Sequence, residues 1–91
     1  MLRLIIQDQN PATTTVAVHG KIAGTDVEIL ATESLRLFRG SQRLLLILDG
    51  VQFIDDAGTD LLQLWAGPRL GLRGGSNFIR ALLRTKGLTV E

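Results

Sequence analysis

The segment Leu44–Asp60, LLLILDGVQFIDDAGTD, constrains the fold more than any other part of the chain. Its first five residues, Leu44–Leu48, are all apolar, which is typical of a central strand in a mainly parallel sheet covered on both sides or nearly so. Two adjacent acids and the start of a helix follow. Loops beyond the carboxyl ends of such strands commonly carry function in α/β proteins. The segment therefore predicts a working surface at Asp55, Asp56, Gly58 and Thr59.

Length and composition limit the class of protein. A chain of 91 residues is large enough for one hydrophobic core, so we predict a single domain over residues 1–91. The absence of cysteine excludes disulfides and thiolate metal sites. The opening MLRLIIQDQN does not resemble a signal peptide, and no apolar stretch approaches the ~20 residues of a membrane span. We expect a soluble cytoplasmic domain without a bound cofactor.

Charge is unevenly distributed although the net charge is only +1. Residues 1–60 hold five basic and eight acidic side chains, whereas residues 61–91 hold five basic and one acidic. A solvated helix face explains the basic end better than a binding role does. A nucleic-acid surface would need more basic residues and aromatic side chains for stacking, and this chain has no tyrosine and one tryptophan. Nucleic acid is therefore not an expected partner.

The first half of the chain predicts a hairpin and a helix. Leu2–Gln7 and Thr13–His19 are the two expected strands, and Gly20 and Gly24 indicate a loop after them. Thr25 and Glu28 match a capping box, in which each side chain accepts from the other residue's backbone N–H. The helix that follows ends at Gly40, and its predicted apolar face consists of Val27, Leu30, Ala31, Ser34, Leu35 and Phe38.

The second half predicts a helix, a strand and a helix after the Leu44–Asp49 strand. A short helix from Ala57 ends at Gly67-Pro68, and its buried side is expected to contain Leu61, Leu62, Leu64 and Trp65. Arg69–Arg73 alternates like a strand. Ser76 is predicted to cap a last helix that buries Phe78, Ile79, Leu82 and Leu83 and ends in a Schellman motif at Gly87-Leu88. The order ββαβαβα indicates an α/β or α+β layer protein.

The chain resembles the STAS family, the domain of anti-sigma factor antagonists and of sulfate-transporter tails. The segment LLLILDGVQFIDDAGTDLL is similar to the family's central strand and its Asp-Ser-Ser-Gly or Asp-Thr-Ala-Gly loop. GPRLGLRGGSNFIRALLRTKGL is similar to its last strand and final helix, and Gly20-Lys21-Ile22 stands where the family often has Gly-x-Leu-Asp. The resemblance implies a single STAS-like domain in which a mixed four-stranded sheet has its helices packed mainly on one face.

The resemblance also assigns a role to the acidic loop. In the anti-sigma antagonists the loop serine is phosphorylated by a partner kinase, and Asp56 occupies that position here. An aspartate in the first turn of a helix caps it, which explains Asp56 without any further function. The functional hypothesis is that Asp56 holds the surface in a partly phospho-like state that no serine kinase can change. Thr59 and Thr25 remain as hydroxyl acceptors, although both fit helix-start residues better.

Other chemistries fit the sequence poorly. The acids at Asp49, Asp55, Asp56 and Asp60 lack the spacing and the distal glutamate of a calcium loop. Ile47 stands where a phosphatase of the Asp-x-Asp-Gly type would need its nucleophile. His19 is the only histidine, and the glycines around Gly74 do not match a Walker or Rossmann phosphate loop. We expect no enzyme activity and no metal.

These observations together predict a module that binds another protein. The predicted contact residues are Asp55, Asp56, Ala57, Gly58, Thr59, Gly24 and Thr25. Trp65 is expected in the core, with an anchoring role in a partner complex or homodimer as the alternative. By resemblance the leading partner is an anti-sigma factor with a histidine-kinase-like ATPase fold, and the output is control of transcription. The alternatives are an accessory subunit that contacts the ATPase of a phospholipid or anion transporter, and a domain that binds a nucleotide or lipid.

Overall fold

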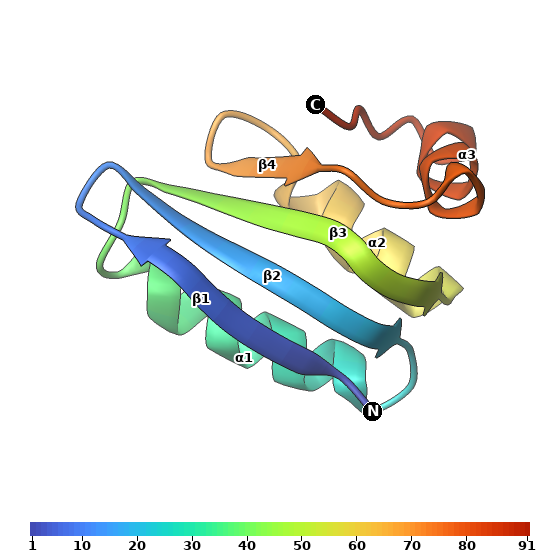
Figure 1. Ribbon diagram of the computed structural model, residues 1–91, viewed down its shortest axis with the longest axis horizontal. Helices are drawn as coiled ribbons and strands as arrows, with labels where there is room; N and C mark the ends of the chain where they lie inside the picture. Colours follow the sequence, from blue (N-terminus) through green and yellow to red (C-terminus); the bar gives the residue numbers. More distant parts are fainter.

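The computed structural model describes residues 1–91, and its elements follow the predicted order ββαβαβα. Four strands form one sheet in the order β1-β2-β3-β4, in which β1 is antiparallel to β2 and the other neighbours are parallel (Figure 1). None of the helices is long and apolar enough to cross a membrane. The elements are β1 (Arg3–Gln9), β2 (Thr13–Ile22), α1 (Asp26–Phe38), β3 (Arg43–Ile54), α2 (Asp56–Trp65), β4 (Leu70–Arg73) and α3 (Asn77–Thr85).

The predicted hairpin of β1 and β2 is confirmed, and both strands are longer than the sequence indicates. The side-chain oxygen of Asn10 accepts the N–H groups of Ala12 and Thr13, each at 2.9 Å, and this Asx turn reverses the chain. β2 continues to Ile22, so Gly20, predicted to lie in a loop, pairs with Val51 inside the sheet. The longer β2 ends level with β3 and places the following loop beside the start of α2.

The helices α1 and α2 cover one face of the sheet and leave the other face open (Figure 1). The core lies on the covered face, where Val18, Leu44, Leu46 and Leu48 are at most 2% exposed. The prediction that β3 is covered on both sides or nearly so agrees with its burial, since Leu44, Leu45, Leu46 and Leu48 are buried and Ile47 is partly exposed, although helices cover only one face. Leu45 faces the open side and is nevertheless only 4% exposed. Arg43 of the same strand helps to shield this face, since its guanidinium lies over Gly71, the cross-strand partner of Leu45.

Each helix buries a narrower stripe than the apolar pattern predicts. Leu30, Ser34 and Leu37 of α1 are buried, whereas Leu35 is 52% exposed. Leu64 of α2 and Phe78 of α3, both predicted to be buried, are 78% and 57% exposed. Successive helical residues rotate by about 100°, so residues that adjoin the buried stripe turn outward when only one neighbouring layer is present. Sequence periodicity identifies the helices but not the width of the buried face.

The two predicted boundaries of α3 are confirmed in detail. Ser76 caps α3, because its Oγ accepts the N–H of Ile79 at 3.2 Å. The predicted Schellman motif closes the same helix: Leu88 donates to the Leu83 carbonyl at 3.0 Å, and Gly87 has φ +77°. The capping box at Thr25 is wrong. This residue already has helical dihedrals (φ −66°, ψ −20°), and its side chain makes no capping hydrogen bond.

Candidate functional site

The loop between β3 and α2 is organised by Asp55. Asp55 is the extended residue before α2 (φ −83°, ψ 179°), and its Oδ1 accepts the N–H of Gly58 at 2.8 Å. Its Oδ2 accepts the N–H of Gly24 at 2.9 Å, in the loop between β2 and α1. The cap predicted at Asp56 is therefore wrong by one residue, because only the extended residue before the helix can reach the third amide of its first turn.

The two amide contacts also set the ionisation of Asp55. The N–H of Gly24, and then that of Gly58, hold the pKa of this carboxyl below its ordinary value of 3.8, while partial burial acts in the opposite direction. Asp55 therefore stays ionised at neutral pH and keeps both acceptors for the amides. The two loops are thus joined through one side chain that is charged at neutral pH.

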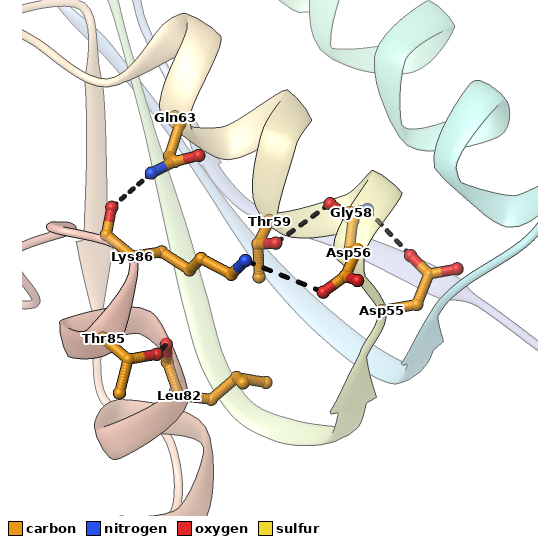
Figure 2. A network of polar contacts seen from close by, with 8 residues as sticks. All are labelled: Asp55, Asp56, Gly58, Thr59, Gln63, Leu82, Thr85 and Lys86. Carbon is orange, nitrogen blue, oxygen red and sulfur yellow. Dashed lines mark hydrogen bonds and ion pairs between the residues drawn. The ribbon is translucent and has the colours of Figure 1, made fainter.

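Asp56 lies at the surface, in the first turn of α2 (Figure 2). Its side chain is 92% exposed, and one carboxylate oxygen is 3.7 Å from Nζ of Lys86. Lys86 follows α3, and its backbone carbonyl accepts from the side-chain amide of Gln63 of α2. The end of α3 is thus attached to α2 at two points, and a cation lies beside an acid that is otherwise open to solvent. An approaching molecule can reach Asp56 directly.

The remaining predicted contact residues divide into exposed and buried groups. Ala57, Gly24 and Thr25 are exposed. Thr59 is 1% exposed, and its hydroxyl donates to the Asp56 carbonyl at 2.9 Å. Gly58 is buried as well, and a Cβ at this position would lie 2.7 Å from the carbonyl oxygen of Ile22. Gly58 and Thr59 therefore stabilise the start of α2 by packing and hydrogen bonding, and neither residue has a side chain that a partner could contact.

Trp65 is partly buried in an aromatic cluster at the far end of α2. Its ring meets that of Phe38 edge to face, with centroids 5.9 Å apart. The guanidinium of Arg69 lies 4.7 Å from the Phe38 ring centroid and donates to the carbonyls of Phe38 and Gln42 at 3.1 and 3.0 Å. The charge pattern predicts Arg69 only as part of a solvated face, but its guanidinium binds the last residue of α1. Arg69 and Phe38 are 31 positions apart, and no local sequence pattern indicates this contact.

The acids of the β3–α2 segment do not converge on a common point. Asp49 points to the turn after β4, where its Oδ1 accepts the N–H of Gly75 at 2.8 Å. No group of three or more His, Cys, Asp or Glu side chains lies close enough to hold a metal ion. Sequence reasoning missed two apolar side chains near the loops, Phe53 and Ile29, which are 41% and 51% exposed. Exposed apolar residues beside a charged loop are typical of protein contact surfaces.

Comparison with known proteins identifies the fold. No family model and no curated protein matches the chain. The structure of the anti-sigma factor antagonist SpoIIAA in its unphosphorylated form is 22% identical, with a TM-score of 0.70 over 97% of this chain and 82% of SpoIIAA. An anti-sigma factor antagonist from Mycobacterium paratuberculosis is 17% identical, with a TM-score of 0.74 over 96% of this chain and 79% of that one. The predicted STAS fold is confirmed.

Proposed function

We propose that this protein is a non-enzymatic interaction module that works in the manner of an anti-sigma factor antagonist. The docking surface, defined as Gly24, Thr25, Asp56 and Ala57, would contact the partner protein. The observation that carries the proposal is the 92% exposed carboxylate of Asp56 at the start of α2, in a fold shared with anti-sigma factor antagonists. The exposed apolar residues Phe53 and Ile29 lie close to the docking surface in the sequence, near the end of β3 and in the first turn of α1.

The docking surface is pre-organised for binding. Asp55 holds the Gly24 loop and the first turn of α2 through one carboxylate, at 2.9 and 2.8 Å. Gly58 packs against the end of β2, so the α2 start cannot shift without disturbing the sheet. A surface that is already ordered loses little conformational entropy when a partner binds. This pre-organisation supports the proposed recognition role.

Asp56 would act as a fixed charge at the position of the regulatory serine. A phosphoserine carries nearly two negative charges, whereas an aspartate carries one at neutral pH. The amide end of α2 favours either group. Thr59 does not replace the missing serine, because its hydroxyl is buried and already donates to the Asp56 carbonyl. The docking surface would thus hold one charge state that a serine kinase cannot alter at this loop position.

The proposed partner is an anti-sigma factor with a histidine-kinase-like ATPase fold. The test is a calorimetric titration of the purified protein with such anti-sigma factors from the same genome. We expect Asp56→Ala to weaken binding about tenfold, equivalent to about 1.4 kcal/mol. Asp8→Ala is the matched control, because Asp8 is an exposed acid at the opposite end of the sheet.

A second variant tests the fixed charge. Asp56→Ser should restore control by a serine kinase, so that its affinity changes on phosphorylation while that of the natural chain does not. If the affinity for the anti-sigma factor were the same for the natural chain, Asp56→Ala and Asp56→Ser, the proposed role of Asp56 would be refuted. Binding to a transporter ATPase subunit, with no affinity for any anti-sigma factor, would assign the chain to transport instead.

A further inference from the structure

A second polar cluster lies on the open face of the sheet, at β4. The side-chain carboxylate of Glu91 lies between two arginines: one oxygen accepts from Arg43, and the other is 3.6 Å from Arg73. The cluster rests directly on Gly71. A Cβ at this glycine would lie 2.2 Å from the Arg43 guanidinium and 2.6 Å from the Glu91 carboxylate. The backbone of β4 therefore forms the floor of a carboxylate-binding site made by two cations.

The same segment occupies the outer edge of β4. After α3 the chain returns along β4 (Figure 1), and the N–H of Glu91 donates to the Leu72 carbonyl at 2.7 Å. Val90 packs against the core. Residues 88–91 thus place a backbone N–H, an apolar side chain and a carboxylate against β4 in the manner of a short extra strand. A cavity of about 360 Å³ adjoins this contact and is lined partly by Leu70, Leu72 and Leu88.

The contacts that hold Glu91 are individually weak. The side chains of Arg43, Arg73 and Glu91 are 34%, 55% and 41% exposed, and solvent screens ion pairs that are this exposed, so each contributes little. The single backbone hydrogen bond to Leu72 adds only a modest net stabilisation. Local opening of such a segment requires little free energy, because Leu88 can stay in the core while residues 89–91 detach, and Val90, which is only partly buried, is the one apolar side chain that leaves its contact. Opening exposes two guanidinium groups and a free strand edge.

We propose that Arg43, Arg73 and the outer edge of β4 form a second binding site, which recognises an extended acidic segment of a partner protein. Glu91 occupies this site from within the chain and shows the chemistry that fits it: a carboxylate for the arginines and an N–H for the Leu72 carbonyl. A partner segment with an apolar residue before its acidic residue would reproduce the Val90-Glu91 contact. The site shares no residue with the docking surface around Asp56, and the inference stands independently of the function proposed above.

The experiment uses the full chain and a peptide with blocked ends that has the sequence of residues 87–91, GLTVE. Fluorescence anisotropy of the labelled peptide measures binding to the natural chain and to Glu91→Gln. In the natural chain Glu91 competes with the peptide, so only molecules whose own segment has detached can bind it, and the apparent affinity falls in proportion to that open fraction. Because Glu91→Gln should raise the open fraction, we expect this variant to bind the peptide about fivefold to tenfold tighter. A peptide that ends in Gln in place of Glu should lose this gain.

Arginine variants in the Glu91→Gln background complete the test. Arg73→Gln should abolish the gain, whereas Arg3→Gln should keep it, because Arg3 is an exposed arginine on β1, at the opposite edge of the sheet from β4. Circular dichroism checks that each variant is folded, and Arg43→Gln gives a second measurement of the same site. Equal binding by the natural chain and Glu91→Gln, or binding that ignores the peptide carboxylate, would overturn the proposal. Self-association of Glu91→Gln without peptide binding would also overturn it, since a second copy would then be the occupant.

Discussion

The carboxylate of Asp55 accepts the backbone N–H of Gly24 at 2.9 Å, across 31 positions of the sequence. Its second oxygen caps α2 through Gly58 at 2.8 Å. One side chain therefore fixes the two loops that surround Asp56. Asp55 acts as the structural residue of the acidic pair, whereas the side chain of Asp56 is 92% exposed and its one ionic neighbour is Lys86 at 3.7 Å. The proposed docking role therefore falls to Asp56.

Replacement of Asp55 by alanine should lower the stability of the fold. The variant loses an N-cap, which contributes about 1 kcal/mol, and leaves the Gly24 N–H without its partner. We expect the free energy of unfolding in urea to fall by about 1–2 kcal/mol. Asp56→Ala is the matched control and should change it by less than about 0.5 kcal/mol, because its side chain is 92% exposed. Equal effects at both positions would contradict the assigned roles.

The stability of the protein should depend on the ionisation of Asp55 in acid. Hydrogen bonds from Gly24 and Gly58 hold the pKa of Asp55 in the folded chain below 3.8, its ordinary value. The unfolded chain therefore takes up this proton first, and the stabilisation is complete above the ordinary pKa and declines as pH falls towards the folded pKa. Urea unfolding between about pH 6 and pH 3 should show a smaller acid-induced loss for Asp55→Asn than for the natural chain. An identical loss in both would show that Asp55 is not a source of the dependence.

Alanine at Gly58 should destabilise the protein although it favours helix formation. Glycine to alanine inside a helix normally adds about 1 kcal/mol of stability. Here the added methyl would lie 2.7 Å from the Ile22 carbonyl oxygen and 2.8 Å from a methyl of Ile54. We expect a net loss of about 1–3 kcal/mol in thermal or urea unfolding. Gly40→Ala is the control, because a Cβ at this position would lie 3.9 Å from its nearest neighbour, the Leu37 carbonyl oxygen. If neither substitution changed the stability, the start of α2 would not be tightly packed.

The native protein should not be phosphorylated at Thr59. The residue is 1% exposed and its hydroxyl donates to the Asp56 carbonyl, so a kinase cannot reach it without opening α2. Mass spectrometry after incubation with a serine/threonine kinase should find no phosphate at Thr59 in the folded chain. The Asp56→Ser variant provides the positive control, since position 56 is exposed in the same loop. Rapid modification of Thr59 under native conditions would contradict the loop geometry.

Local sequence patterns determined most of the fold. The apolar run in β3, the cap at Ser76 and the turn at Gly87-Leu88 depend on residues a few positions apart, and each forms where the pattern predicts it. These signals are short-range because strand alternation, helix periodicity and capping bonds involve neighbours in the chain. The element order follows from them, whereas the STAS-like sheet was implied by the resemblance of the motifs to that family.

Only the tertiary structure decided which acid caps α2, which sheet face stays open and which apolar helix residues point outward. The contacts of Asp55 with Gly24 and of Arg43 with Glu91 join residues 31 and 48 positions apart. Local sequence propensities do not predict these long-range contacts, because the contacts depend on how whole helices and strands pack together. The sequence by itself thus determined the elements and the loop that bears Asp56. The packing of distant segments decided that Asp55 builds this loop, that Asp56 is exposed on it, and that Glu91 lies between two arginines.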